Sequence, residues 1–214
     1  KPSLSQITLS NGPAILMARD TTIPMVTLVG ALPIGLNAQT SSARGVMQVI
    51  AEGFACHHPN FPQPDSARKW LSAHGIMIET QLESDFMRIG MRLPAREWKN
   101  GLEYLLEIIQ PNPFTTSQID QCKTQLAAGI QLMEAVPWYN FSAELNAQYY
   151  GSEAWKMNET GDYPSVRRVD SAKVDSFLAS FPRSYATLMM GGDFKQDSLL
   201  KWLQDHESEL NQRP

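Results

Sequence analysis

The chain begins with short apolar runs of the kind that form β-strands. Gln6–Leu9 and Ala14–Met17 flank Ser10-Asn11-Gly12, and an Asn-Gly pair readily takes the positive φ angles of a type I′ hairpin turn. Met25–Leu32 is rich in β-branched and apolar residues, which favours a third, central strand. We therefore expect the chain to open with a small antiparallel sheet.

The apolar spacing then changes to that of a helix. Within residues 41–54, four apolar side chains recur at helical spacing and share one face: Val46, Val49, Ile50 and Phe54. Ser41 or Ser42 is the expected N-cap of this helix. A shorter helix is expected over Asp65–His74, where Asp65 caps the start and Gly75 ends it.

The rest of the chain continues with hairpins and long helices. Further strands are expected over Ile76–Leu82, Phe86–Leu93 and Tyr185–Met190. Further helices are expected over Ala95–Ile109, Thr116–Met133, Trp138–Tyr150, Asp170–Phe181 and Gln196–Arg213. Because strands and helices do not alternate as in βαβ units, the pattern predicts an α+β fold, an antiparallel sheet with helices packed on one face.

Composition narrows the class of protein. The 214 residues are 43% apolar and 19% charged, which is an ordinary globular balance with enough apolar surface for a core. The formal net charge is -4, and no run of Lys and Arg is present, so the sequence disfavours nucleic acid as a partner. No apolar stretch reaches the roughly 18–20 residues of a transmembrane segment.

Two further features of the sequence leave questions open. Cys56 and Cys122 are the two cysteines, and the sequence does not decide whether they pair. The chain starts at Lys1 without an initiator Met or a signal peptide and ends in a polar stretch. These ends favour a piece of a longer, multi-domain protein.

The order of these elements, together with several short motifs, resembles a known family. The motifs are Leu9-Ser10-Asn11-Gly12, Ser42-Ala43-Arg44-Gly45, Leu71–Gly75, Gly101–Leu106, Tyr150-Gly151 and the closing segment Val169–Leu203. Over nearly its whole length the chain resembles one half of a pitrilysin/insulysin-type zinc metallopeptidase. The same module occurs in mitochondrial processing peptidase and in the core proteins of the cytochrome bc1 complex. The resemblance implies a single domain over residues 1–214, with lobes 1–110 and 111–214.

The residues that would carry the family's chemistry are missing. Active members have H-x-x-E-H on the first helix, where two His residues ligate zinc and the Glu takes a proton from the metal-bound water. Aligned on Gly45, these positions hold Gln48, Ala51 and Glu52. The third ligand should fall near Ala127–Ile130, a segment without any carboxylate. We therefore expect no catalytic residues, no metal and no cofactor in this chain, and zinc is possible in the parent protein or a partner domain.

Other candidate sites have a plainer interpretation. Cys56-His57-His58 is a dense cluster of soft ligands, but its spacing fits an exposed, proline-bordered loop better than a metal site. No G-x-S-x-G or phosphate-binding loop is present. The aromatic and Met-rich stretch Met133–Tyr150 is either a partner surface or, as the helical spacing favours, part of the core.

One position retains a binding interest. In active relatives the strand edge that corresponds to Glu79-Thr80 receives substrate peptide by β-augmentation. The resemblance thus implies a non-catalytic domain that forms part of a peptide-binding clamshell with another peptidase-like domain or subunit, a second copy of this chain included. Two alternatives are a peptidase with an altered metal site at Gln48, Glu52 and Glu134, and a purely architectural subunit. By family analogy we expect a periplasmic or membrane-associated bacterial setting.

Overall fold

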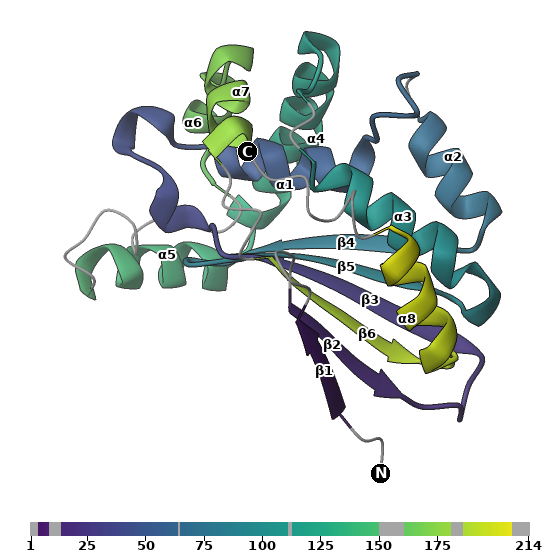
Figure 1. Cartoon of the computed structure of the whole chain (residues 1–214). Helices are drawn as coiled ribbons and strands as arrows, with labels where there is room; N and C mark the ends of the chain where they lie inside the picture. The colour runs from purple at the N-terminus through teal and green to yellow at the C-terminus, as the bar shows by residue number, and fades with distance from the viewer. Residues whose placement is uncertain are drawn as a thin grey trace.

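The computed structural model describes residues 4–8, 14–63, 65–110, 113–149, 161–180 and 186–206. Its strands are β1 (Leu4–Thr8), β2 (Ala14–Arg19), β3 (Met25–Leu32), β4 (Met77–Leu82), β5 (Met87–Pro94) and β6 (Thr187–Gly192). Its helices are α1 (Val46–Cys56), α2 (Ser66–Ala73), α3 (Trp98–Ile108), α4 (Thr116–Glu134), α5 (Pro137–Tyr149), α6 (Tyr163–Arg167), α7 (Ser171–Ser180) and α8 (Gln196–Asp205). Figure 1 shows a layer of helices above one twisted sheet.

The six strands form a single sheet in the order β1-β2-β6-β3-β5-β4. All neighbouring pairs are antiparallel except β2 and β6, which run parallel with Ala14 opposite Thr187. The sheet is therefore mixed, whereas a purely antiparallel sheet was expected. The reason is that β6 returns from the end of the chain and inserts between β2 and β3, and a strand antiparallel to β3 in that place must run parallel to β2.

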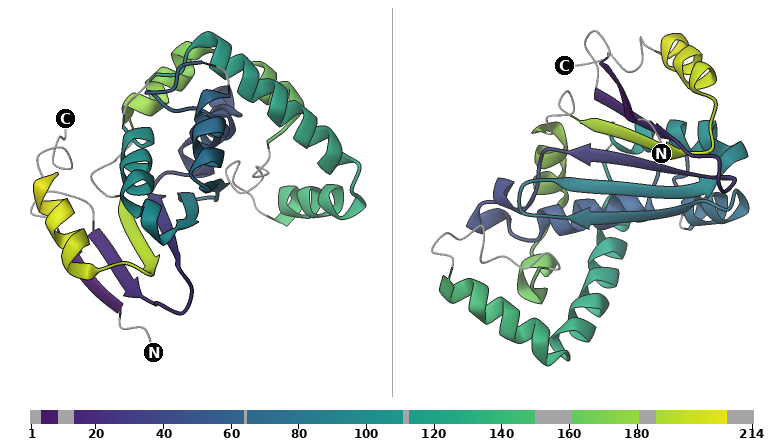
Figure 2. Two further views of the ribbon diagram at one scale, coloured as in Figure 1. Left: turned by 90° about the vertical axis from the view of Figure 1, so that its right-hand side faces the viewer. Right: turned by 90° about the horizontal axis from the view of Figure 1, so that it is seen from below.

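The helices cover one face of the sheet, as the sequence predicts. Along β3 the side chains of Val26, Leu28 and Leu32 are buried, whereas Met25 and Thr27 are exposed on the other face. Helices α3 and α8 lie over the central strands, where Trp98 and Trp202 meet edge to face with ring centroids 6.5 Å apart. Seen from below, the opposite face of the sheet is open (Figure 2). The α+β class is thus confirmed.

Helix α1 is the centre of the helical layer. It contacts β4 and β5 of the sheet and the helices α4, α6 and α7, so nearly all of its residues are buried. The helix starts later than expected, because Gly45 is its N-cap with φ +88° and Ser41–Ala43 forms a separate 3-10 turn. Ser41 and Ser42 are therefore not its N-cap. Gly45 takes this left-handed backbone to bring α1 against Ser165 and Val166.

The remaining elements agree with the sequence within a few residues. Helix α6 was missed, because five residues are too few to show a helical period. The expected Asn-Gly turn and Tyr150-Gly151 lie outside the described residues, although the pairing of Thr8 with Ala14 shows β1 and β2 as a hairpin. The expected last helix is described only as far as Asp205. None of the helices in the described part of the chain combines the length and the apolar content that a transmembrane segment needs.

Helix α5 and the end of α4 correct another expectation. The helical spacing of Met133–Tyr150 favours a place in the core, but large apolar side chains of this stretch are exposed to solvent, among them Met133, Trp138 and Tyr149. Only the first part of α4 packs on α1, and beyond Ile130 the helix leaves the body of the protein. The periodicity is that of an amphipathic helix, but its apolar side chains are largely exposed to solvent in the part of the chain that the structure describes.

Candidate functional site

The three positions of the family's zinc motif lie on α1, as the alignment on Gly45 predicts. Gln48 is buried, and Gly161, which precedes α6, packs directly on its side chain. Ala51 is also buried, so the position of the general base contributes only a methyl group to the core. Glu52 is the one member that reaches a solvent-accessible groove. Gly161 thus covers the place where the first zinc ligand would lie.

The remaining donors do not complete a zinc site. On α4 the expected third position falls on Ala127–Ile130, which carries no ligand, and Glu134 lies in the exposed last turn of the helix. Among the described residues, no three His, Cys, Asp or Glu side chains come close enough together to hold a metal ion. Zinc sites in proteins need at least three such donors around one point. The donor set present on α1 and α4 therefore does not fit the family's zinc ion.

In place of a metal site, the end of α1 carries a polar cluster around a thiol. The Cys56 thiol donates to Glu52 Oε1 at 3.1 Å, one helical turn away, and Gln125 Oε1 of α4 lies 3.3 Å from the same sulfur. Arg68 of α2 donates through Nη2 to the sulfur at 3.1 Å. Sequence reasoning missed this cluster, although the i, i+4 spacing of Glu52 and Cys56 was a signal for it.

The thiols in this region are not poised for nucleophilic chemistry. Burial raises the pKa of Cys56 to about 11, and the bond to Glu52 acts in the same direction. Burial also raises the pKa of Cys122. Both cysteines are free, which answers the question of whether they pair. A thiol with a raised pKa is a poor nucleophile at neutral pH, so the cluster is better suited to holding α1, α2 and α4 together.

A groove runs from this cluster to the edge of the sheet. It has a volume of about 550 Å³ and lies between α1, α2 and the first residues of β4. Glu52 and Arg68 give it charged walls, and Leu71 and Ile76 contribute apolar surface. Strand β4 is the last strand of the sheet and pairs only with β5 among the described strands. The groove therefore opens beside a sheet edge with unpaired backbone groups.

The structure places Glu79 and Thr80 on β4, at this edge. Their side chains point to opposite faces, as neighbours on a strand must. Glu79 is on the open face, where its side chain crosses Gly90 and its Oε1 lies 3.5 Å from Nη2 of Arg88. Thr80 is half-buried on the side that faces the helices, together with Ile78. The edge is thus brought next to α1, and Glu79 is engaged by its neighbour on β5.

The Cys56-His57-His58 segment is not the exposed loop that its sequence suggests. All three residues are buried. The His58 ring lies 4.1 Å from the ring of Tyr104, and His57 faces Phe114 at 6.1 Å between centroids. Aromatic neighbours on α3 and before α4 attract the imidazoles into the core, which the flanking prolines do not reveal.

Comparison with known proteins shows which molecules share this fold. No family model matches the sequence, and no curated protein matches it. Solved structures do match. An inactive domain of an M16 peptidase from Pseudomonas fluorescens is 17% identical with a TM-score of 0.82, covering 99% of this chain and 52% of that one. The periplasmic protease PqqL from Escherichia coli is 14% identical with a TM-score of 0.85, covering 100% of this chain and 25% of that one. A chain of complex III2 from Candida albicans is 14% identical with a TM-score of 0.75, covering 95% of this chain and 46% of that one.

These similarities fix the architecture. The chain spans about half the length of the P. fluorescens chain and a quarter of PqqL. At identities of 14–17% the likeness concerns the fold. The resemblance inferred from the motifs is confirmed at that level, and the chain has the fold of one half of an M16, pitrilysin-type peptidase.

Proposed function

We propose that this chain is a non-catalytic peptidase-like domain that contributes a peptide-binding edge to an assembly with a second domain of the same fold. The observation that carries the proposal is the position of α1. The helix lies against the free edge of the sheet, as a catalytic helix would, but presents Gln48, Ala51 and Glu52 in place of H-x-x-E-H.

The loss of chemistry follows from the side chains themselves. A methyl group at Ala51 cannot take a proton from water, and loss of general-base assistance removes roughly 10²–10⁴ in rate. Zinc also generates the nucleophilic hydroxide in this type of mechanism. Loss of the metal therefore lowers the catalytic rate by more than loss of the general base does. The alternative of an altered metal site at Gln48, Glu52 and Glu134 is disfavoured, because Gln48 lies under Gly161 and Glu134 sits in the exposed end of α4. Absence of zinc from this chain stays a prediction.

The edge of β4 supports a role in peptide binding. An extended peptide can add to an unpaired edge through main-chain hydrogen bonds, and pockets beside the edge then select its side chains. Here the groove with Arg68, Glu52 and Ile76 lies directly next to the edge and is large enough for one or two side chains. Gln48, Ala51 and Glu52 replace the reacting residues of H-x-x-E-H, which supports a domain that holds peptide rather than cleaves it.

The proposal includes a partner. The chain covers 52% of the P. fluorescens chain and 25% of the E. coli chain, and both hold further sequence of similar or greater length. We propose that a second peptidase-like domain would cover the groove and the free edge of β4. We further propose a periplasmic or membrane-associated setting, for which the E. coli protein of this fold, described as periplasmic, gives support.

Peptide binding is tested by amide chemical shifts in the labelled chain. We would titrate a mixture of unstructured, mainly apolar decapeptides and follow the backbone amides of β4 (Met77–Leu82) and, as an internal control, those of β1 (Leu4–Thr8), the opposite edge of the sheet. The proposal predicts saturable shifts along β4 and the groove residue Arg68, with β1 unaffected. Shifts at neither edge would instead favour an architectural subunit, the role that a core protein plays in complex III.

A further inference from the structure

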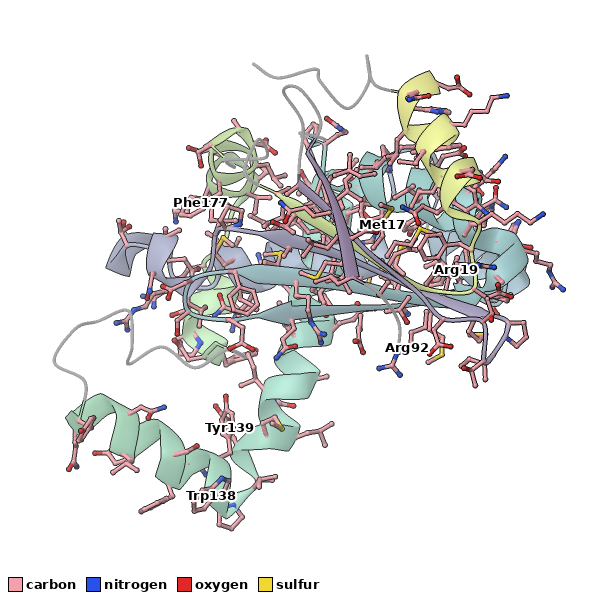
Figure 3. All side chains as sticks on the ribbon, turned by 60° about the horizontal axis from the view of Figure 1, so that its bottom comes forward. Met17, Arg19, Arg92, Trp138, Tyr139 and Phe177 are labelled. Carbon is pink, nitrogen blue, oxygen red and sulfur yellow. The ribbon has the colours of Figure 1, made fainter. Side chains whose placement is uncertain are left out.

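The end of α4 and the whole of α5 form an arm that leaves the body of the protein. Helix α5 begins at Pro137, directly after the corner at Ala135 and Val136, and its main neighbour in the fold is α4. Figure 3 shows Trp138 on this arm, well apart from the sheet and from α8. The two views in Figure 2 agree that α5 stands clear of the sheet and of the other helices.

The arm carries an apolar stripe on its surface. Four large side chains recur at i, i+3, i+7 and i+11 of α5 and share one face: Trp138, Phe141, Leu145 and Tyr149. Each is at least half exposed, and Trp138 and Tyr149 reach 72% and 78%. Leu132, Met133 and Val136 extend the stripe around the corner into α4. An amphipathic helix whose apolar face is exposed to solvent offers that face for packing against another molecule.

We propose that this stripe is the surface through which two copies of the chain associate. The inference rests on the proposed function, which calls for a second domain of the same fold as the partner. It adds the identity of that partner, a second copy of this chain, and the surface that the two copies share. The first argument is composition. Helix α5 carries a single charged residue, Glu144, and the stripe combines Trp, Phe, Tyr, Leu and Met. Depletion of charge and enrichment in aromatic residues and Met mark the centres of protein interfaces.

The second argument is area. An aromatic side chain buries about 150–250 Å² when it is covered. At their observed exposures, the three aromatic residues of α5 therefore present roughly 400 Å² of side-chain surface to solvent. The aliphatic residues of the stripe add further apolar surface. A stable interface takes about 800 Å² from each partner, whereas the largest apolar patch of an ordinary monomer is about 300–600 Å². The stripe is thus large for a monomer and supplies a major part of what a dimer needs.

The third argument is that the stripe complements itself. Two α5 helices packed antiparallel place Trp138 of one copy at the Tyr149 end of the other, and Phe141 opposite Leu145 near the centre. Residues 138 and 149 are about 16 Å apart along the helix, so both aromatic ends are covered in one two-fold arrangement. Glu144 lies on a different side of the helix and brings no like charges together at this contact. A closed dimer is the simplest assembly that buries such a stripe.

Sedimentation velocity of the purified chain, from low-micromolar to hundred-micromolar concentration, tests the proposal. We expect a concentration-dependent dimer. The variant Trp138→Ala/Phe141→Ala/Tyr149→Ala should sediment as a monomer throughout, since Ala preserves helix propensity while removing the stripe. The matched control is Leu4→Ala/Ile23→Ala/Phe86→Ala, which truncates three exposed apolar residues elsewhere on the surface and should remain dimeric.

Two results would overturn the proposal: a wild-type chain that is monomeric over the whole range, or a dimer that persists in the α5 variant. If that variant fails to fold by circular dichroism, Leu145→Lys serves in its place, because Lys is a good helix former and puts a charge on the stripe. The peptide-induced shifts along β4 are measured on the monomeric variant as well. If the variant is monomeric and still binds peptide at β4, the dimer surface and the peptide-binding edge are independent. Failure of one proposal can then be told apart from failure of the other.

Discussion

The buried histidines show how the surroundings of a residue decide its chemistry. His57 and His58 carry the most common metal-binding side chain, yet they are packed among aromatic rings before α2. Burial lowers the pKa of both, and that of His58 falls to about 4. A hydrogen bond to the backbone of Tyr104 opposes this effect but does not remove the cost of burying a charged imidazole, and the half-exposed Glu107 lies with Oε2 3.0 Å from His58 Nε2.

A pH dependence of stability follows from His58. Because its pKa is about 4 in the folded chain and about 6.5 when unfolded, the unfolded state takes up a proton first as the pH falls. The free energy of unfolding should therefore decrease between pH 6.5 and 4, by up to roughly 3 kcal/mol from this residue. Urea unfolding at a series of pH values measures it. In His58→Gln the decrease over this range should be smaller, and an equal decrease would contradict the assignment.

The cysteines give a second prediction at this scale. Cys56 and Cys122 are buried, and burial raises the pKa of both thiols. Ellman's reagent should therefore react slowly with the native chain at pH 8 and rapidly with two thiols after denaturation. Glu52→Ala removes the carboxylate that raises the pKa of Cys56 and should speed the reaction of one thiol. Rapid reaction of the native wild-type chain would show that the cluster is open.

Sequence reasoning succeeded and failed at this scale for identifiable reasons. It placed Gln48, Ala51 and Glu52 on one helix, because a local period and one glycine fix their register. It missed the cluster of Cys56, Arg68 and Gln125, because these residues come from three helices that only the fold brings together. It also misjudged His58, since the rings that bury it lie elsewhere in the chain.

At the scale of elements, glycines decide how the helices start and pack. Gly45 has φ +88°, and a Cβ there would lie 2.9 Å from the backbone of Ser165 and Val166. Gly129, in the middle of α4, has no atom within 4 Å of such a Cβ. The two positions therefore differ in both backbone angle and space, and the same substitution should have opposite effects.

Gly45→Ala should destabilise the chain, by about 1–3 kcal/mol, because the side chain strains the left-handed backbone and pushes α6 from α1. Gly129→Ala should stabilise it by about 0.5–1 kcal/mol, because Ala loses less entropy in a helix. Chemical denaturation of both variants beside the wild type measures the difference. A Gly45→Ala variant as stable as Gly129→Ala would contradict the role given to Gly45.

Most elements were predictable because each has its own period or cap. The capping box of Thr115 and Gln118 at the start of α4 is one example, and the apolar face of α3 is another. The position of β6 between β2 and β3 was not predictable, because strand order depends on contacts between residues that are far apart in the sequence. The helical period of α5 also does not reveal that its apolar face is exposed to solvent. The same periodicity is found in helices whose apolar face is buried and in helices whose apolar face is exposed.

At the scale of the whole molecule, the chain has the fold of a peptidase half with different side chains at the reacting positions. The sheet has an open face, a groove lies beside β4, and α5 carries an exposed apolar stripe. Its division into lobes 1–110 and 111–214 stays a prediction, although β6, from the second lobe, lies within the sheet. The account thus assigns binding and assembly, rather than hydrolysis, to the part described here.

The zinc content of the purified chain tests this central claim most directly. The chain is equilibrated with a small excess of zinc, freed of loosely bound metal on a desalting column, and analysed by plasma mass spectrometry beside Glu52→Ala. The account predicts far less than one zinc per chain in both proteins, because Gln48 and Ala51 lie in the core and α4 supplies no third ligand. One zinc per wild-type chain that is lost in Glu52→Ala would contradict it and restore a metal-dependent role for α1.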